Sequence, residues 1–336
     1  MKATAVFAAE KETVRVQEFS LEEGDLEPGF LLVETRHSLI SPATELACLA
    51  GSETSWFRFP QQLGYCAAGQ VLAVGEAVSG VKAGDTVLTL SPHASHALVH
   101  RDQVRARVPA GMDLTLAVFA NLAFVSMTAL RISSAELGDH VAVIGLGLVG
   151  NLAAQLFQAQ GSQVIGIDRL ASRLELARRS GVESVVDASA EDSILAVRRM
   201  TDGRGAEVVV EATGAALAAF EGMQMAAPNG ELVLLGTPRG SCELDVVPLL
   251  RTVHNAVPNL TIKGAHVFSA PELTRPHTKH SMERNARICL ELATRGELRF
   301  EPLLSQVARP SEAPQIYRAL REKPGEFMGV VFDWTG

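Results

Sequence analysis

The stretch VAVIGLGLVG at residues 141–150 constrains the fold of this chain more than any other part of its sequence. An apolar run that suits a buried strand leads into Gly145-x-Gly147-x-x-Gly150, and an amphipathic stretch, NLAAQLFQAQG, follows directly. Glycines fall at this spacing by chance, but here the strand before them and the helix after them give the motif its context. The stretch therefore predicts a strand, a tight turn and a helix in succession.

The residues that follow repeat this succession of strand and helix. Strand-like segments, QVIGID, SVVDAS, EVVVEAT and ELVLLGT, alternate with helical stretches. This alternation predicts an α/β fold of the Rossmann type, a doubly wound parallel sheet with helices on both faces. The first third differs, because FLLVETRHSLI, GQVLAVG and DTVLTLS are short alternating segments separated by turn signals. LTIKGAHV and GEFMGVVFDW predict two later strands, and SMERNARICLELATRG predicts a late helix.

The glycine motif and the next strand end together predict a dinucleotide site. Gly145 permits the tight turn, Gly147 lets the backbone approach a pyrophosphate, and Gly150 lets the helix lie close to the strand. Asp168 ends the next strand, 18 residues after Gly150. A carboxylate there can accept hydrogen bonds from ribose hydroxyls and would repel a 2′-phosphate, which favours NAD over NADP.

Further cofactor positions follow from the ends of the predicted strands. Arg169 could pair with a phosphate, which keeps NADP as the less favoured alternative, and Arg173 could lie over the adenine or remain a solvated helix residue. EATG and LGTPRG break into small residues where ligands of such sheets bind. The remaining cofactor positions that we assign are Leu148, Val149, Arg169, Arg173, Ala212, Thr213, Gly214, Gly236, Thr237, Pro238 and His266.

Composition narrows the range of partners. The chain has 336 residues, a formal net charge of −8 and no run of Lys or Arg, so we expect no nucleic acid. No window approaches 18 uninterrupted apolar residues and the first residues resemble a strand and turn, so we expect neither a membrane span nor a signal peptide. The four cysteines form no CxxC, which predicts reduced thiols in a cytoplasmic protein.

The whole chain resembles the medium-chain dehydrogenase/reductase superfamily. KAGDTVLTL looks like the GDxV strand of that family, VPAGMDLTLAVFANLAFVSMTAL resembles its linking segment, and the tail with Tyr317 and GEFMGVVFDW also fits. The resemblance implies a GroES-like β-barrel domain from 1–121 and 266–336, a Rossmann domain from 122–265, and an active site in the cleft between them. It also implies a homodimer joined through sheet edges, with LTIKGAHV as the edge strand.

The same resemblance bears on zinc. Zinc members carry a cysteine where this chain has Ser41, and Gly-His-Glu where it has Gly64-Tyr65-Cys66. A hydroxyl and a neutral phenol are poor zinc ligands, so we predict that no zinc is bound. SPATE and GYxxxGxV resemble a zinc-lacking subgroup that includes bacteriochlorophyllide dehydrogenases and relatives fused to sugar-type oxidoreductase domains. Cys66 with Glu45 is the weaker metal alternative.

A histidine series downstream is not expected to bind metal. His93, His96 and His100 lie in SPHASHALVHRD, which reads as a strand, so His93 and His96 should point to opposite faces. We expect these histidines to be exposed or bonded locally.

Without zinc, hydrogen-bond donors must polarise the substrate carbonyl. Tyr65, Ser41 and Thr44 are the candidates, with Tyr65 as proton donor after its pKa is lowered, which NAD⁺ could assist. Glu45 is a base or, as we favour, an anchor for the loop. His37 is a relay to solvent or, preferably, an ordinary strand-end residue.

These inferences predict a zinc-independent, NAD(H)-dependent dehydrogenase that interconverts a secondary alcohol and a ketone. The small-molecule substrate would be sugar-like or cyclitol-like, with a hydroxyethyl tetrapyrrole as the second option. A quinone or enoyl reductase acting on a conjugated C=C is one alternative, and a nucleotide-binding protein without catalysis is another.

Overall fold

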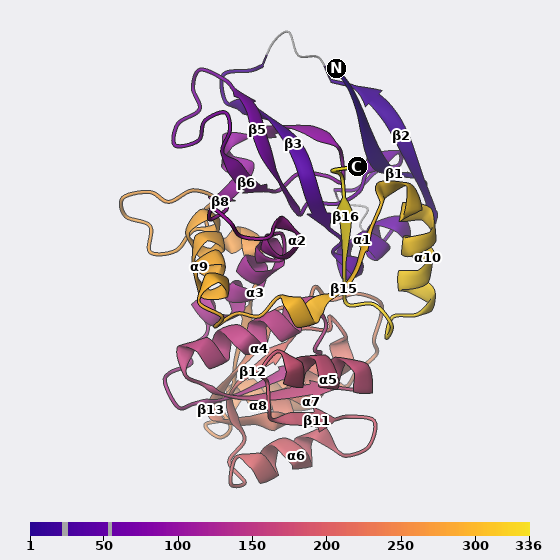
Figure 1. Cartoon of the computed structure of the whole chain (residues 1–336). Helices are drawn as coiled ribbons and strands as arrows, with labels where there is room; N and C mark the ends of the chain where they lie inside the picture. The colour runs from indigo at the N-terminus through magenta and orange to yellow at the C-terminus, as the bar shows by residue number, and fades with distance from the viewer. Residues whose placement is uncertain (22–25, 53–55) are drawn as a thin grey trace. The chain divides into compact units, whose positions relative to one another are not determined.

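The computed structural model describes residues 1–21, 26–52 and 56–336, which form two compact units (Figure 1). The first, called here the β-rich unit, comprises Met1–Leu122, Pro271–Thr294 and Leu304–Gly336. The second, called the Rossmann unit, comprises Ala123–Ala270 and Arg295–Leu303. The domain limits expected from the sequence, at 121 and 266, remain predictions.

The Rossmann unit is built on a six-stranded parallel sheet in the order β11-β10-β9-β12-β13-β14. The strands are β9 (His140–Ile144), β10 (Gln163–Asp168), β11 (Val185–Asp187), β12 (Ala206–Glu211), β13 (Ala226–Leu234) and β14 (Thr261–Gly264). The order reverses between β9 and β12, and ligands of such sheets bind at the carboxyl ends of the strands at that point. The predicted doubly wound fold is confirmed.

Both faces of this sheet are covered, which explains why its strands are apolar throughout. Val141 and Val143 of β9 join a core with residues of α3 and α4, whereas Ala142 and Ile144 join a second core with residues of α6 and α7. The helices are α3 (Ala120–Ile132), α4 (Leu148–Gln160), α5 (Ala171–Arg179), α6 (Ser193–Met200), α7 (Ala216–Met225) and α8 (Val246–His254).

The β-rich unit contains a three-stranded sheet, β2-β1-β4, and a larger sheet, β15-β16-β3-β5-β6-β8, in which β7 also pairs with β3. The strands are β1 (Lys2–Glu10), β2 (Thr13–Ser20), β3 (Phe30–Leu39), β4 (Gln61–Gln62), β5 (Ala67–Val74), β6 (Thr86–Thr89), β7 (His96–His100), β8 (Val104–Arg107), β15 (Leu304–Ala308) and β16 (Gly329–Asp333). The helices are α1 (Pro42–Leu49), α2 (Leu114–Ala117), α9 (Met282–Thr294) and α10 (Ala313–Glu322). The arrangement fits the predicted GroES-like domain.

Among the described residues, one helical segment, Leu114–Ile132, is long and apolar enough to cross a membrane by length and composition alone. Its most apolar window is 67% buried inside the fold. A buried core helix of a globular protein meets the same criterion, so the segment is weak evidence for a span.

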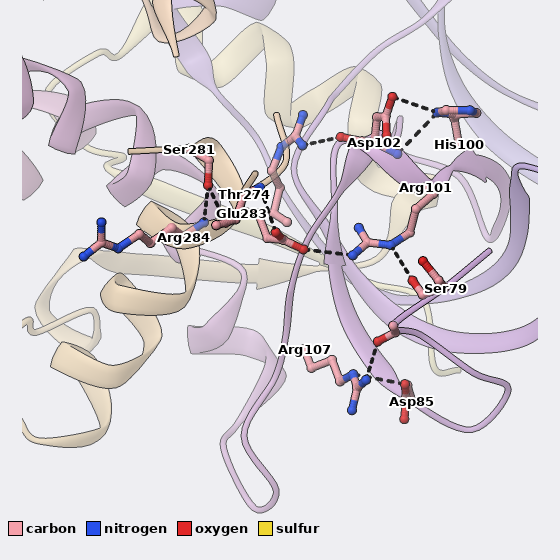
Figure 2. Close-up of polar contacts among 12 residues, drawn as sticks. Ser79, Asp85, His100, Arg101, Asp102, Arg107, Thr274, Ser281, Glu283 and Arg284 are labelled. Carbon is pink, nitrogen blue, oxygen red and sulfur yellow. Dashed lines mark hydrogen bonds and ion pairs between the residues drawn. The ribbon is translucent and has the colours of Figure 1, made fainter. Parts of the chain in front are cut away.

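An ion pair joins the late segment of the β-rich unit to the turn between β7 and β8 (Figure 2). Arg101 Nη2 lies 2.8 Å from Glu283 Oε1 of α9, while Arg101 Nε donates to the Ser79 carbonyl. Glu283 also accepts a hydrogen bond from the backbone N–H of Thr274. The pair of Arg101 and Glu283 therefore joins two parts of the β-rich unit that are 182 residues apart in the sequence.

Candidate active site

The glycine loop of the Rossmann unit leaves room for a ligand at one position and none at its neighbours. A Cβ added at Gly150 would overlap the carbonyl oxygen of Gly145, and Gly145 has a φ of +89°. A Cβ at Gly147 would meet no described atom within 4 Å. Gly147 is the N-cap of α4 and contributes no side-chain cap, so the first N–H groups of the helix face that open space. Free N–H groups beside open space suit a phosphate.

Asp168 lies next to this loop and is only 7% exposed. Its Oδ2 accepts a hydrogen bond of 2.7 Å from the backbone N–H of Leu146, and its Oδ1 accepts one of 2.9 Å from Leu170. Arg173 Nη1 lies 3.6 Å from Oδ2, whereas Arg169 is exposed. Each carboxylate oxygen has a second lone pair, so Asp168 can still accept a hydroxyl of a ligand.

The loops after β12 and β13 meet the glycine loop at the same edge of the sheet. A Cβ at Gly145 would collide with Thr213, and one at Gly214 would collide with the carbonyl of Thr237. Glu211, 1% exposed, holds the β12 loop by accepting the N–H groups of Thr213 and Gly214. The structure therefore brings together the predicted positions Ala212, Thr213, Gly214, Gly236, Thr237 and Pro238, near Leu148 and Val149 of α4.

His266, the last predicted cofactor position, follows β14 and is exposed. Its ring lies 5.5 Å from that of Phe268 in a tilted arrangement. It is at the carboxyl end of the edge strand, while the glycine loop follows the central strand β9.

In the β-rich unit, the two segments that suggested chemistry do lie together. Tyr65 Oη donates a hydrogen bond of 2.6 Å to Ser41 Oγ, and Thr44 also bonds the phenol. Ser41 directly precedes α1, and Tyr65 lies in the turn before β5. Pro42 at the first position of α1 suits a helix start, since a proline there loses no needed N–H.

Glu45 fixes the start of α1 from inside the unit. It is 2% exposed, and its Oε1 accepts a hydrogen bond of 2.7 Å from the backbone N–H of Ser41. Its Oε2 lies 3.1 Å from His93 Nε2 and accepts a hydrogen bond from the hydroxyl of Tyr317. Two donors and the His93 ring therefore surround the carboxylate, which supports the anchoring role over the role of a free base.

Burial raises the pKa of the two phenols and of one thiol around Glu45. It raises the pKa of the Tyr65 phenol above its usual value, with smaller raising effects from Cys66 and Glu45. Burial, followed by the charge of Glu45, likewise raises the pKa of the Cys66 thiol and of Tyr317. The protein itself thus keeps Tyr65 a neutral phenol, and the lowering expected from the sequence is not supplied by the residues around it.

His93 corrects the expectation for the histidine series. It precedes β7, is 0% exposed and bonds residues far away in the sequence, so the prediction of an exposed or locally bonded side chain is wrong. His96 and His100 do make local contacts, with Ser95 and Asp102 respectively. β7 begins only at His96, and His93 lies buried in the connection before it.

His37 lies apart from this cluster. Its Nε2 is 3.3 Å from the hydroxyl of Thr115 and 3.7 Å from Asp333 Oδ1. Burial lowers the pKa of His37, which outweighs the raising effect of Asp333. None of the described contacts joins it to Ser41 or Tyr65, since alternation along β3 points Ser38 toward the cluster and His37 away.

Known proteins resemble this chain over most of its length. The L-threonine 3-dehydrogenase of Bacillus subtilis (strain 168) is 31% identical over 242 residues, which cover 62% of this chain and 68% of that protein. The chain belongs to the medium-chain dehydrogenase/reductase superfamily. The family profile described as zinc-binding dehydrogenase matches residues 149–278 of this superfamily member.

Two further proteins resemble this chain, one in sequence and one in fold. The D-guloside 3-dehydrogenase of Escherichia coli (strain K12) is 28% identical over 277 residues, 81% of this chain and 77% of that protein. The crystal structure of galactitol-1-phosphate dehydrogenase from Escherichia coli has the same fold, with a TM-score of 0.85 at 19% identity, covering 98% of this chain and 99% of that chain. The superfamily and its oxidoreductase class, predicted from the sequence, are confirmed.

The side chains at the positions where the resemblance implies zinc ligands do not suit the metal. Ser41 Oγ already accepts the Tyr65 proton, and the raised pKa of Tyr65 disfavours the phenolate that a metal would need. Both oxygens of Glu45 are engaged by donors. The residues at these positions therefore do not fit a zinc ion.

The sequence predicted no site role for four residues of the cluster, namely Ser38, His93, Tyr317 and Trp334. Trp334 Nε1 donates to Ser38 Oγ at 2.9 Å, and Ser38 Oγ lies 2.8 Å from His93 Nδ1. Each partner comes from a different part of the chain, so no local pattern linked them. The polar residue Ser38 inside a buried strand was the one available signal.

Proposed function

We propose that this chain is a zinc-independent, NAD(H)-dependent oxidoreductase that interconverts a secondary alcohol and a ketone. The observation that carries the proposal is the hydrogen bond of 2.6 Å between Tyr65 and Ser41, which occupies the positions of two zinc ligands in the family. Two hydroxyl groups held this way can bind a substrate oxygen and stabilise the charge that develops on it.

The cofactor would be held by the loops at the carboxyl edge of the parallel sheet. Gly147 and the start of α4 would bind the pyrophosphate, and Asp168 the adenosine ribose. When bound, the nicotinamide supplies the acceptor or donor of a hydride. The carboxylate of Asp168 favours NAD, because it would repel the 2′-phosphate of NADP.

Tyr65 would hold the proton at the substrate oxygen. When a ketone binds, the single O–H of the neutral phenol would turn from Ser41 Oγ to the ketone oxygen, and in reduction it would transfer that proton as negative charge builds there. The hydroxyls of Ser41 and Thr44, both bonded to the phenol, would then donate their own protons to the tyrosinate that remains. Glu45 would fix the backbone of Ser41, and His37 would have no direct role.

The names of the relatives guide the choice of substrate. D-guloside, threonine and galactitol-1-phosphate, for which the three similar proteins are named, each present a secondary alcohol among other polar groups. We propose a sugar-like or polyol-like alcohol in a biosynthetic pathway, with a hydroxyethyl tetrapyrrole as second choice. The free thiols of the four cysteines suit a reducing compartment, and we place the reaction in the cytoplasm.

We also propose a homodimer joined through β14. This strand ends the sheet order and most of its residues are exposed. The adjacent part of the Rossmann unit contributes α8, which has no buried residue and several exposed apolar ones. An exposed edge strand beside apolar side chains is suited to pairing with a second copy.

The first experiment combines metal analysis of the purified protein with fluorescence titration of NADH and NADPH, followed by turnover on polyols, glycosides and their ketones. We expect no stoichiometric zinc, tighter NADH binding and turnover of at least one polar alcohol. Stoichiometric zinc with loss of activity on chelation would contradict the proposal. NADPH preference with activity on conjugated C=C would favour a quinone or enoyl reductase, and binding without turnover a non-catalytic protein.

Tyr65→Phe is the variant that tests the proposed proton donor. Loss of the phenolic proton should lower kcat by about 100-fold or more, since general acid catalysis contributes at least that much. The NADH dissociation constant should not change, because Tyr65 belongs to the β-rich unit and the glycine loop to the Rossmann unit. Unchanged kcat would remove Tyr65 from the mechanism.

A further inference from the structure

His93 lies at the centre of a set of buried and half-buried polar side chains that we call the Glu45 network, namely Ser38, Ser41, Glu45, Tyr65, His93, Tyr317 and Trp334. Its ring also contacts the ring of Phe332 of β16 edge to face, with centroids 5.2 Å apart. A fully buried imidazole needs a partner for each nitrogen, and here both nitrogens have one.

The donors and acceptors of the network select one tautomer of His93. The indole N–H of Trp334 can only donate, so Ser38 Oγ accepts from it. Trp334 and His93 are the two partners of Ser38 Oγ among the described residues. Because Trp334 donates to this oxygen, the proton of Ser38 itself can point at His93 Nδ1. Nδ1 is then an acceptor, and the ring proton lies on Nε2, where it points at Glu45 Oε2.

This tautomer matches the needs of Glu45. The ionised carboxylate then accepts three hydrogen bonds, from Ser41 N–H, His93 Nε2–H and the Tyr317 hydroxyl. The other neutral tautomer would place a lone pair of Nε2 against a carboxylate oxygen, which is repulsive. A buried charge is tolerated when it is hydrogen-bonded in this way.

The His93 ring also supports the backbone beside Tyr65. Gly64 has a φ of +89°, and a Cβ added there would lie 2.5 Å from His93 Cδ2. The ring thus packs directly on the residue that precedes Tyr65, and through Glu45 it reaches the backbone of Ser41. The same side chain therefore contacts the supports of both hydroxyl-bearing residues.

We propose that His93, as the Nε2–H tautomer fixed by Trp334 through Ser38, is a positioning residue that holds the Tyr65–Ser41 hydrogen bond in place for catalysis. The catalytic part of this inference rests on the proposed function. The positioning itself is a property of the β-rich unit and is measurable without turnover.

The test compares His93→Gln and His93→Met in the full-length protein. Glutamine retains an N–H donor for Glu45, whereas methionine has a similar length but no donor. Since Tyr65 is one of two tyrosines, its ring signals can be assigned by NMR with a Tyr317→Phe reference. We expect His93→Met to shift the Tyr65 signals and to lower kcat by about 10- to 100-fold. The cofactor dissociation constant should stay the same, and His93→Gln should restore most of both properties.

Nitrogen NMR of His93 measures directly which ring nitrogen carries the proton. Trp334→Phe should weaken the preference for the Nε2–H tautomer. Trp56→Phe is the control at the other tryptophan. A proton on Nδ1 in the native protein, or equal Tyr65 signals in the two His93 variants, would overturn the inference. Wild-type inactivity on every substrate together with the expected Tyr65 shift would contradict the proposed function and leave the positioning supported. Equal kcat in the two His93 variants of an active enzyme would overturn the catalytic part.

Discussion

Asp168 and Leu146 join the ends of two neighbouring strands, because the carboxylate of Asp168 at the end of β10 accepts the backbone N–H of Leu146 after β9 at 2.7 Å. Leu146 lies between Gly145 and Gly147. The residue proposed to bind the ribose therefore also holds the loop proposed to bind the pyrophosphate, so cofactor selectivity and loop geometry depend on one side chain.

Asp168→Ala should weaken NADH binding by about 10-fold or more, because it removes both the ribose acceptor and a charged hydrogen bond to the loop. NADPH binding should fall less or improve, since Arg169 and Arg173 would then face a 2′-phosphate without the opposing carboxylate. Fluorescence titration of both cofactors measures the ratio. Asp187→Ala is a matched control, because Asp187 pairs in register with Asp168 at the end of β11 but bonds only its local turn. Equal losses for both cofactors would contradict the selectivity role.

Gly147→Ala should lower NADH affinity without a large change in the stability of the fold. The added Cβ meets no described atom and the φ of −62° suits any residue, so the free energy of unfolding should change by less than about 1 kcal/mol. The methyl group would occupy the space proposed for the pyrophosphate, and NADH affinity should fall by about 10-fold or more. Gly150→Ala, which would collide with the Gly145 carbonyl, should instead lower the melting temperature clearly. Unchanged NADH binding in Gly147→Ala would place the phosphate elsewhere.

The strands, helices and glycine loop could be predicted because their causes are local. Apolar runs such as VAVI mark strands buried on both faces, and the glycines mark positions where a Cβ does not fit. Ser41 and Tyr65, 24 residues apart, were paired by resemblance to a family whose fold brings those segments together.

The rest of the Glu45 network could not be predicted, because its members meet only after folding. Glu45 is 48 residues from His93 and 272 from Tyr317, and Ser38 is 296 residues from Trp334. A histidine in a polar stretch is usually exposed, and nothing in SPHASH indicates that this one is buried. The raised pKa of Tyr65 could not be predicted either, since it depends on burial and on the charge of Glu45.

The dimer proposal makes a surface prediction for the Rossmann unit. Val246, Leu250 and Val253 lie on one side of α8 by their helical spacing, and Leu250 is 58% exposed. Leu250→Asp combined with Ile262→Lys on β14 should convert the dimer to a monomer in size-exclusion chromatography with light scattering. Leu195→Asp on α6, at a residue 64% exposed, should have no effect. A dimer that survives the double substitution would place the interface elsewhere.

The two tyrosines predict how the protein responds to alkaline solution. Burial raises the pKa of both phenols in the folded state, whereas in the unfolded chain they titrate near pH 10. The folded state therefore retains protons that the unfolded chain releases, so this contribution to stability is complete below about pH 10 and is lost as pH rises further. For the buried Tyr317 the loss can reach about 1.4 kcal/mol per pH unit. The raised pKa of Cys66 acts in the same direction from about pH 8.5.

Tyrosinate absorbance measures this directly, because Tyr65 and Tyr317 are the sole tyrosines in the sequence. The native protein should show no tyrosinate at a pH where the urea-unfolded chain is half ionised, and the urea midpoint should fall as pH increases beyond that point. Tyr65→Phe leaves Tyr317 as the single reporter and should retain the native delay. A native titration that coincides with that of the unfolded chain would show that neither phenol is shielded, and it would remove the basis for Tyr65 as a neutral donor.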